Sequence, residues 1–540
     1  MRILIVSACM LASASLALAQ PVTPSGKPGT VDGIVTNSVT RDPLRKAIVT
    51  LQSTNGSSAQ ATTDAAGHFH FDKVEPGTYS INANRDGFMN TGRQPKTVKV
   101  GEEENVEDVT VALQPLAHVA GHVFDEDGDP IMLASVQALH YGYNQGRKTL
   151  LPGAFATSND LGEFEFSGLE PGRYFFIANA RPPVQNLPPR TRFVGQLMAY
   201  PQTFYPSAAD VAQATPSQLA PGATISNIDF HLRRVPAFRV SGKLLDAAGQ
   251  PARNAFVSLV DASQATMRNP HPNSQVMDDG SFSLPTVVPG TYLLTATHGQ
   301  LDFASEQITV TDEDLDGIAL AFSRGIAISG QFSTDGAGTE QINGRVNLWP
   351  AERDRAFYVP PQSQPQQDGA FIIENVRPGS YSINIFVGAH AGYVKSIRFG
   401  DSDVSDGELT LTQGSTGPLN IVVGTDGGQI QGTIQTETGA PAARGTVWLF
   451  PVADPPGRRD LVKQAGTDGQ GNFKFQNVAP GGYKVFAWGE SAPDEVYVPE
   501  FRKVLERHAA SVTVQPNGQA TVQVQIIPAD EVETAKNKLQ

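Results

Sequence analysis

A motif that recurs five times constrains this 540-residue chain more than any other feature. Each copy begins with Asp, continues through a turn glycine and apolar residues at every second position, and ends in Pro-Gly-x-Tyr. The tyrosines that end the copies are Tyr79, Tyr174, Tyr292, Tyr381 and Tyr483. Because successive side chains of a strand point to opposite faces, a period of two predicts β-strands. The Asp-Gly and Pro-Gly steps predict the turns between them.

Every copy also has similar flanks. A glycine in an apolar context precedes each copy, at Gly33, Gly121, Gly242, Gly330 and Gly432, and an alternating strand follows it. Short strands with one apolar face predict two packed sheets. We therefore expect an all-β fold of five tandem Greek-key-type β-sandwich modules after a signal peptide. The repeated tyrosine is interpreted as an anchor at the core edge, with its ring inside and its hydroxyl bonded to the backbone.

The spacing of the repeats predicts the module boundaries. We expect the modules at residues 28–115, 116–235, 236–325, 326–427 and 428–530. The second contains an insertion at 181–222, rich in Tyr and Pro, and a loop of this length is either functional or a linker. A helix is expected from Pro499 to His508, and residues 531–540 are expected to form a tail. The short linkers at Pro115, Val235, Gly325 and Gly427 predict limited flexing between modules.

Residues 1–19 have the pattern of a secretory signal peptide. Arg2 precedes an apolar stretch, and Ala17-Leu18-Ala19 forms a small-residue cleavage site before Gln20. The one cysteine of the chain, Cys9, lies inside this segment, so the mature protein is expected to lack disulfides. We expect an exported protein, periplasmic or extracellular, without a transmembrane segment in the mature chain.

The formal net charge of −14 bears on possible partners. An acidic surface repels nucleic-acid phosphates and anionic lipids, so no nucleic-acid partner is expected. A protein or a polysaccharide remains as the partner, of unknown identity.

With these motifs the chain resembles the carboxypeptidase regulatory-like domains, which are transthyretin-like β-sandwiches grouped with the carbohydrate-binding-like folds. The resemblance rests on the Gly-initial strand, the Asp-x-x-Gly-x-Phe-x-Phe segment and the Pro-Gly-x-Tyr step, and it covers nearly the whole mature chain. The tandem layout is similar to that of secreted acidobacterial proteins. The resemblance implies a fold and an accessory role, and it implies no peptidase activity.

The sequence lacks the motifs of common catalytic centres. None of its histidines begins a His-x-x-Glu or His-Glu-x-x-His zinc motif, and it contains no Gly-x-Ser-x-Gly elbow and no phosphate-binding loop. We expect no enzymatic activity, no catalytic residues and no cofactor. Asp312, Asp314 and Asp316 follow the opening of a calcium loop, but Ser323 occupies the position of the required Glu. These residues predict either a weak calcium site or a polar hairpin turn.

Aromatic residues indicate where a sugar could bind, because the C–H faces of sugar rings stack on flat side chains. The candidates are Trp349 in the fourth module, Trp448, Trp488 and Tyr497 in the fifth, and Tyr141, Tyr143, Tyr200, Phe204 and Tyr205 in the second. By alternation, Trp448 lies opposite the inward Val447 and Leu449, which predicts that it faces outward. The alternative is burial against the second sheet or between modules.

Together these features predict a non-catalytic exported multi-module protein that works in binding or as a structural element in adhesion or scaffolding. One alternative is a carbohydrate-binding protein that uses the aromatic residues named above. The other is an accessory subunit of a separate hydrolase or outer-membrane transporter.

Overall fold

A computed structural model describes residues 27–539, apart from gaps at 54–55, 91–95, 145, 181–195, 262–272, 300–301, 324, 337–341, 343, 352–360, 389–391, 437–438, 443–444, 456 and 490–491. The predicted signal peptide of residues 1–19 lies outside the described residues, as does the first part of the predicted insertion, 181–195. The chain divides into two compact units, Met1–Pro115 and Leu116–Gln540.

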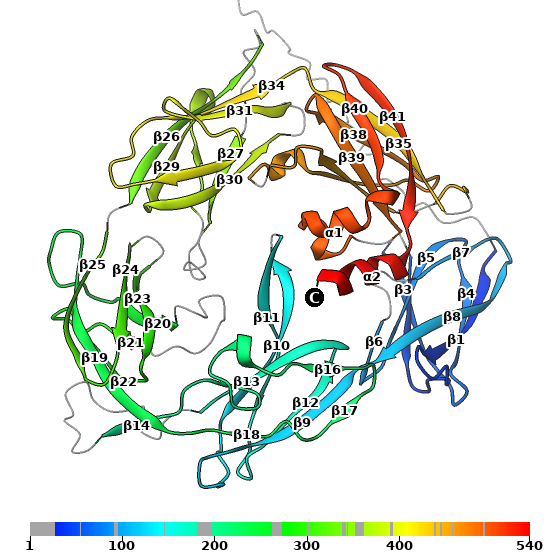
Figure 1. Cartoon of the computed structure of the whole chain (residues 1–540). Helices are drawn as coiled ribbons and strands as arrows, with labels where there is room; N and C mark the ends of the chain where they lie inside the picture. Colours follow the sequence, from blue (N-terminus) through cyan, green and yellow to red (C-terminus); the bar gives the residue numbers. More distant parts are fainter. Residues whose placement is uncertain are drawn as a thin grey trace, which may run out of the picture. The chain divides into compact units, whose positions relative to one another are not determined.

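Five separate hydrophobic cores define five tandem β-sandwich modules, whose strands are seen along the chain in Figure 1. The core residues run from Val31 to Leu113 in module 1, Ala117 to Leu232 in module 2, Phe238 to Phe322 in module 3, Ile328 to Val423 in module 4 and Ile430 to Val524 in module 5. In each module, apolar residues at alternate strand positions fill the space between two layers of strands. In module 5 the two layers belong to one continuous seven-stranded sheet.

Module 1 shows the shared topology in two four-stranded sheets. One has the order β4-β1-β8-β6, with β1 at Gly29–Asn37, β4 at His68–Val74, β6 at Phe88–Asn90 and β8 at Asn105–Pro115. The other has the order β3-β2-β5-β7, with β2 at Ile48–Ser53, β3 at Ser58–Thr62, β5 at Gly77–Asn84 and β7 at Lys96–Val100. Strand β1 pairs antiparallel with β4 and parallel with β8, and the first strand of every later module repeats this combination.

Modules 2 and 3 follow the same plan. The elements of module 2 are β9 (Ala117–Phe124), β10 (Ser135–Asn144), β11 (Arg147–Thr157), β12 (Glu163–Leu169), β13 (Gly172–Asn179), β15 (Thr203–Phe204), η1 (Val211–Gln213), β16 (Ser217–Leu219), β17 (Thr224–Ile225) and β18 (Phe230–His231). Those of module 3 are β19 (Val235–Leu245), β20 (Phe256–Asp261), β21 (Asn273–Gln275), β22 (Ser281–Val287), β23 (Gly290–His298), β24 (Asp302–Val310) and β25 (Leu315–Ala321). Strand β14 (Leu197–Ala199) comes from the predicted insertion.

Module 4 is made of β26 (Ile326–Thr334), β27 (Gly344–Pro350), β28 (Gln364–Pro365), η3 (Gln367–Gly369), β29 (Ala370–Val376), β30 (Gly379–Val387), β31 (Tyr393–Phe399), β32 (Ser402–Asp403), β33 (Glu408–Leu411) and β34 (Leu419–Gly424). Module 5 is made of β35 (Gly428–Gln435), β36 (Thr446–Pro451), η4 (Arg459–Leu461), β37 (Lys463–Gly466), β38 (Asn472–Val478), β39 (Gly481–Trp488), η5 (Asp494–Tyr497), α1 (Pro499–Val504), η6 (Glu506–His508), β40 (Ala510–Val514), β41 (Gln519–Ile527) and α2 (Ala529–Leu539).

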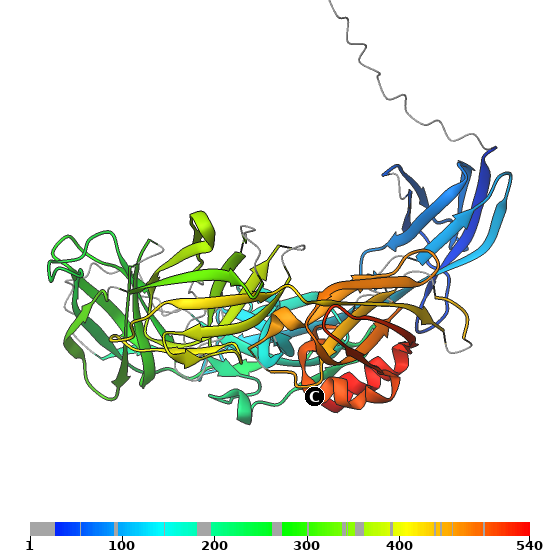
Figure 2. The same ribbon diagram turned by 90° about the horizontal axis from the view of Figure 1, so that it is seen from above.

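The helices near the C-terminus correct one expectation. Residues 531–539 belong to α2, where a tail was expected, and both Figure 1 and Figure 2 show α1 and α2 side by side next to the strands of module 5. The helix expected from Pro499 to His508 is split into α1 and the short η6. No helix in the described part of the chain has the length and apolar composition needed to cross a bilayer.

The glycine at the start of each repeat is explained by crowding inside the sheet. A Cβ atom on Gly33 would lie 2.1 Å from the carbonyl oxygen of Val109 and 2.4 Å from the ring of Phe69. Similar approaches to a carbonyl oxygen of the parallel neighbouring segment occur at Gly121, Gly242, Gly330 and Gly432. A glycine lets the phenylalanine of the repeat lie flat over the strand.

The turn that follows is held by one side chain. The Oδ1 atom of Asp64 accepts hydrogen bonds from the backbone N–H groups of Ala66 and His68, at 2.9 and 2.8 Å. Asp468 forms the corresponding pair of bonds in module 5, and Asn159 takes this place in module 2. An Asx turn of this kind fixes the hairpin that delivers the Phe-x-Phe strand to the core.

Candidate functional site

The two tryptophans proposed as sugar contacts lie together on module 5, but beneath helices. Trp448 on β36 and Trp488 on β39 point away from the sandwich core, as alternation predicts. They are nevertheless only 9% and 4% exposed. The rings stack in two pairs, Trp448 with Phe450 at 6.0 Å and Trp488 with Phe486 at 5.9 Å between ring centres. The expectation that these tryptophans are available to a sugar is wrong.

The cover is a helical cap formed by η5, α1, η6 and α2. Buried residues of the cap form a second hydrophobic core with the outward rings of β36 and β39. These residues are Val496, Val498, Phe501, Leu505 and Ala535. Burying a large apolar side chain stabilises a fold by about 1.5–3 kcal/mol. Packing the helices over the four aromatic rings of this face therefore stabilises module 5. The aromatic face of module 5 is therefore part of a buried core between the sandwich and the helical cap.

Tyr497 belongs to the cap itself. Its ring meets Trp448 edge to face, at 5.4 Å and 88°, and the guanidinium of Arg459 lies 4.9 Å from its ring centre. The indole Nε1 atoms of Trp448 and Trp488 are buried without a hydrogen-bond partner among the described residues. An unpaired buried donor costs about 1–3 kcal/mol, which offsets part of the apolar stabilisation of the cap.

Tyr200 and Tyr205, from the described part of the insertion, pack against the core of module 2. Both are half-buried. The ring of Tyr205 lies edge-on to Phe230 at 6.0 Å, and its hydroxyl donates to the carbonyl of Asn227 at 3.5 Å. Burial raises the pKa of Tyr200. The structure thus places these two tyrosines in the wall of the module and apart from the aromatic residues of module 5.

The acidic residues proposed for calcium contact an arginine instead. Because β25 pairs in parallel with β19, Arg239 on β19 reaches the loop before β25, and its Nη2 atom lies 3.1 Å from a carboxylate oxygen of Asp314 and of Asp316. Hydrogen bonds from Ser241 and then Arg239 hold the pKa of Asp316 below its usual range. Asp312 is not brought into this group, and no set of three His, Cys, Asp or Glu residues is placed to hold a metal in the described residues. Asp314 and Asp316 therefore form ion pairs with Arg239. No local pattern in the sequence indicated these pairs, because Arg239 lies 75 residues before Asp314.

Contacts between consecutive modules were missed by sequence reasoning. Strand β14, from the insertion in module 2, pairs antiparallel with β19 of module 3 through Leu197–Ala199 and Val235–Ala237. Between modules 3 and 4, the guanidinium of Arg377 lies 3.5 Å from the ring centre of Phe303. The insertion therefore acts as a strand donor to its neighbour.

The joint between modules 4 and 5 is built from polar groups. Arg458 of module 5, only 6% exposed, donates to the carbonyl oxygens of Val394 and Ser405 in module 4, at 2.6 and 2.9 Å. It also forms a two-pronged ion pair with Asp460, with both bonds at 2.8 Å. Both Nη groups of the guanidinium thus donate across the module boundary, while Nε and Nη2 bind Asp460 within module 5.

The linker at this joint is held from both sides. The Asp426 carboxylate accepts a hydrogen bond from the Tyr393 hydroxyl of module 4 at 2.9 Å. The carbonyl of the same residue accepts from the backbone N–H of Asn517 in module 5 at 2.7 Å. Burial and this carboxylate raise the pKa of Tyr393. The linker beside Gly427, where limited flexing was expected, is thus hydrogen-bonded to both modules.

Family models match two of the modules. Residues 30–113 match the carboxypeptidase regulatory-like domain. Residues 236–318 match the second β-sandwich domain of the BOS complex subunit NOMO1-like family. No curated protein matches the chain.

Several solved structures are also similar. The TIE protein of Bacillus anthracis is 13% identical over 55% of this chain and 51% of its own, with a TM-score of 0.17. The major pilin subunit BcpA of Bacillus cereus is 14% identical over 55% of this chain and 100% of its own, with a TM-score of 0.17. The shaft pilin SpaA of Lactobacillus rhamnosus GG is 11% identical over 39% and 98%, with a TM-score of 0.22.

Proposed function

We propose that this protein is an exported, non-catalytic scaffold whose bonded modules present surfaces to a protein or polysaccharide partner. The observation that supports this most strongly is the burial of Arg458 between modules 4 and 5. A guanidinium loses several kcal/mol of hydration when it is buried, so it is buried only where its hydrogen bonds are kept. A joint of this kind holds two modules at a fixed spacing.

The other joints support the same reading. Modules 2 and 3 are joined by the pairing of β14 with β19, and modules 3 and 4 by the stacking of Arg377 on Phe303. Each pair of consecutive modules in the unit Leu116–Gln540 is therefore in contact. Backbone pairing between modules is the same contact by which sheets add strands from partners, and it resists bending. A set of modules spaced in this way is suited to displaying or bridging macromolecules. Export to the periplasm or the exterior rests on the leader pattern of residues 1–19.

The scaffold proposal is tested by hydrogen exchange on the mature chain, residues 20–540. The variant Arg458→Met keeps the unbranched apolar stem of the side chain and removes its five donors. We expect the amide of Asn517, whose N–H donates to the Asp426 carbonyl across the joint, to exchange at least roughly tenfold faster in the variant. The variant Lys474→Met, on an exposed site of module 5, is the matched control and should leave this amide unchanged. Fast exchange of the Asn517 amide in the unmodified protein would contradict a fixed joint.

A second experiment tests export. Amino-terminal sequencing of the protein isolated from its host envelope or medium should begin at Gln20. Recovery of an intact Met1 end in the soluble cell interior would overturn this part of the proposal.

A further inference from the structure

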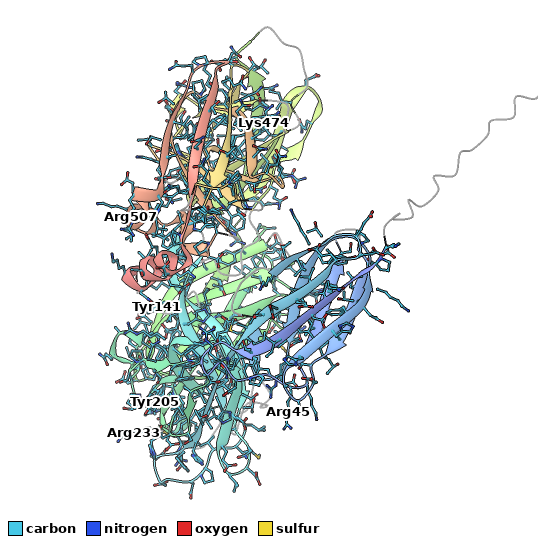
Figure 3. The ribbon with its side chains drawn as sticks, turned by 90° about the vertical axis from the view of Figure 1, so that its right-hand side faces the viewer. Arg45, Tyr141, Tyr205, Arg233, Lys474 and Arg507 are labelled. Carbon is cyan, nitrogen blue, oxygen red and sulfur yellow. The ribbon has the colours of Figure 1, made fainter. Side chains whose placement is uncertain are left out.

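Module 2 contains a cavity at the end of its core. The cavity has a volume of about 150 Å³ and is lined by His140, Tyr141 and the segment Glu170–Tyr174. It lies where β10 and β13 run past the Pro171–Gly172 turn, and Figure 3 labels Tyr141 on this module. The residues that line this cavity differ from those that form the joint between modules 4 and 5.

The repeated tyrosine behaves differently at this place. The hydroxyls of Tyr79, Tyr292, Tyr381 and Tyr483 each donate to the carbonyl four residues earlier, at 2.8–2.9 Å. Tyr174 is buried to a similar degree, yet it makes no such bond to Glu170 and no other hydrogen bond with the described residues. Burial raises the pKa of its hydroxyl to about 12, so the group is a neutral donor and acceptor at physiological pH.

The residue opposite the tyrosine also differs. In the antiparallel pairing the partner is Ser53, Asp261, Pro350 and Pro451 in modules 1, 3, 4 and 5. In module 2 it is His140, whose ring lies 5.6 Å from that of Tyr174. Burial lowers the pKa of His140, which keeps the imidazole neutral, with one donor and one acceptor nitrogen.

One nitrogen of the His140 imidazole lacks a hydrogen-bond partner among the described residues. This atom, Nδ1, is buried. The neighbouring strand leaves room beside it, because Gly153 has no side chain: a Cβ atom there would lie 3.3 Å from this nitrogen and 3.0 Å from the Tyr174 ring. Buried polar groups of native proteins nearly always have a hydrogen-bond partner. A small shift of the His140 ring that lets a ligand hydroxyl reach Nδ1 would remove the free-energy cost of leaving this nitrogen unpaired.

We infer that this pocket of module 2 binds a single pyranose residue of a glycan. A cavity of about this volume accommodates one six-membered ring. The rings of His140, Tyr174 and Pro171 supply an apolar wall for the C–H face of a sugar. Glu170 at the exposed rim supplies an acceptor for sugar hydroxyls, and Arg173 supplies donors.

Other occupants fit this lining less well. An aromatic side chain would fill the volume and leave His140 and the Tyr174 hydroxyl unpaired. A free anion would meet the Glu170 carboxylate at the rim. A polyhydroxylated ring satisfies both the acceptors and the donors of the site. The inference is independent of the bonded joints and holds or fails separately from the scaffold.

The test uses the whole mature chain on a glycan array, followed by ligand-observed NMR with glucose, galactose, mannose and N-acetylglucosamine. We expect binding of at least one of these sugars, weakened at least roughly fivefold in Tyr174→Phe and in Glu170→Ala, the effect of one lost hydrogen bond. Gly153→Ala should weaken binding further because its methyl group enters the space beside His140.

Matched controls locate the site. Tyr79→Phe makes the same chemical change in module 1, and Arg458→Met disrupts the joint, so both should leave sugar binding unchanged. Thermal unfolding of each variant separates loss of binding from loss of fold. Two results would overturn the inference: no binding of any glycan, or binding that stays unchanged in Tyr174→Phe and Gly153→Ala. Binding of inorganic phosphate or acetate in place of sugars would overturn it as well.

Discussion

The outer faces of module 1 and module 5 carry opposite chemistry on equivalent strands. In module 1 the outward pair across β2 and β5 is Thr50 and Asn82. In module 5 the pair at the same place, across β36 and β39, is Trp448 and Phe486. Among the described residues no second core covers the first face, whereas the second face is covered by the helical cap.

This difference shows how one sandwich acquires a third layer. The inward residues of both modules are of the same kind, so the two sandwich cores are alike. What changes is whether the outward positions are polar or aromatic, and an apolar face must be buried against another element. Module 2 is intermediate, because Leu139, Phe175 and Phe204 form a smaller outer core to which residues from the insertion contribute.

The largest expected effect comes from removing a ring of the covered face. Trp488→Ala should destabilise module 5 by about 3–5 kcal/mol, the usual cost of truncating a buried aromatic residue. Asn82→Ala, on the equivalent face of module 1, should stay within about 0.5 kcal/mol. Urea unfolding resolved by hydrogen exchange for each module measures both. Equal effects would show that the cap adds nothing to the stability of module 5.

The next effect compares the repeated tyrosines. Tyr79→Phe, Tyr292→Phe and Tyr483→Phe each lose one hydrogen bond to a carbonyl and should cost about 1 kcal/mol. Tyr174→Phe should cost less than about 0.5 kcal/mol, because its hydroxyl makes no hydrogen bond with the described residues. Denaturant unfolding of the four variants gives the comparison, and a loss at Tyr174 as large as the others would remove the distinction between module 2 and its neighbours.

A smaller effect sharpens the role of the unpaired indoles in the cap. Trp488→Phe removes a buried N–H that has no partner and loses some ring area, two changes of opposite sign. We expect a net change of less than about 1.5 kcal/mol, well below that of Trp488→Ala. Thermal unfolding compares the two variants. Similar losses for Phe and Ala would indicate that the indole nitrogen has a partner in solution.

The smallest effect concerns the pH dependence of the cap. Hydrogen bonds from Arg507 and His508 to Glu531 of α2 lower the pKa of that carboxyl below its usual value near 4.5. A group with a depressed folded-state pKa stabilises the fold fully at neutral pH, and this stabilisation is lost as the pH falls through the folded value. Helical circular dichroism should therefore decline from pH 5 toward pH 3. The decline should be shallower in Glu531→Gln, and an identical profile would contradict this pairing.

The repeated elements could be predicted from the sequence because they depend on local patterns. The five tyrosines, the opening glycines and the outward direction of Trp448 all follow from a period of two and from turn residues. Such patterns report which face a residue is on, and they do not report what covers that face.

The remaining features depend on pairing between segments distant in the sequence. The cap covers Trp448 with Phe501 and Ala535, more than fifty residues later, and Arg239 meets Asp314 through the parallel register of β19 and β25. The position of His140 opposite Tyr174 follows from the unbroken register between β10 and β13, two strands joined only through the fold. The donation of β14 to module 3 likewise had no local signal in the sequence.

The fixed joint between modules 4 and 5 is the central claim, and a distance between two spin labels tests it most directly. Cys9, the one cysteine, lies in the predicted leader, so cysteines introduced at the exposed Glu408 and Lys474 would be the sites of labelling in the mature chain. Lys474 is labelled in Figure 3. Pulsed electron resonance should give a single narrow distance distribution that broadens in Arg458→Met, while a control pair at Lys474 and Lys503 within module 5 stays narrow. A broad distribution in the unmodified protein would contradict the account.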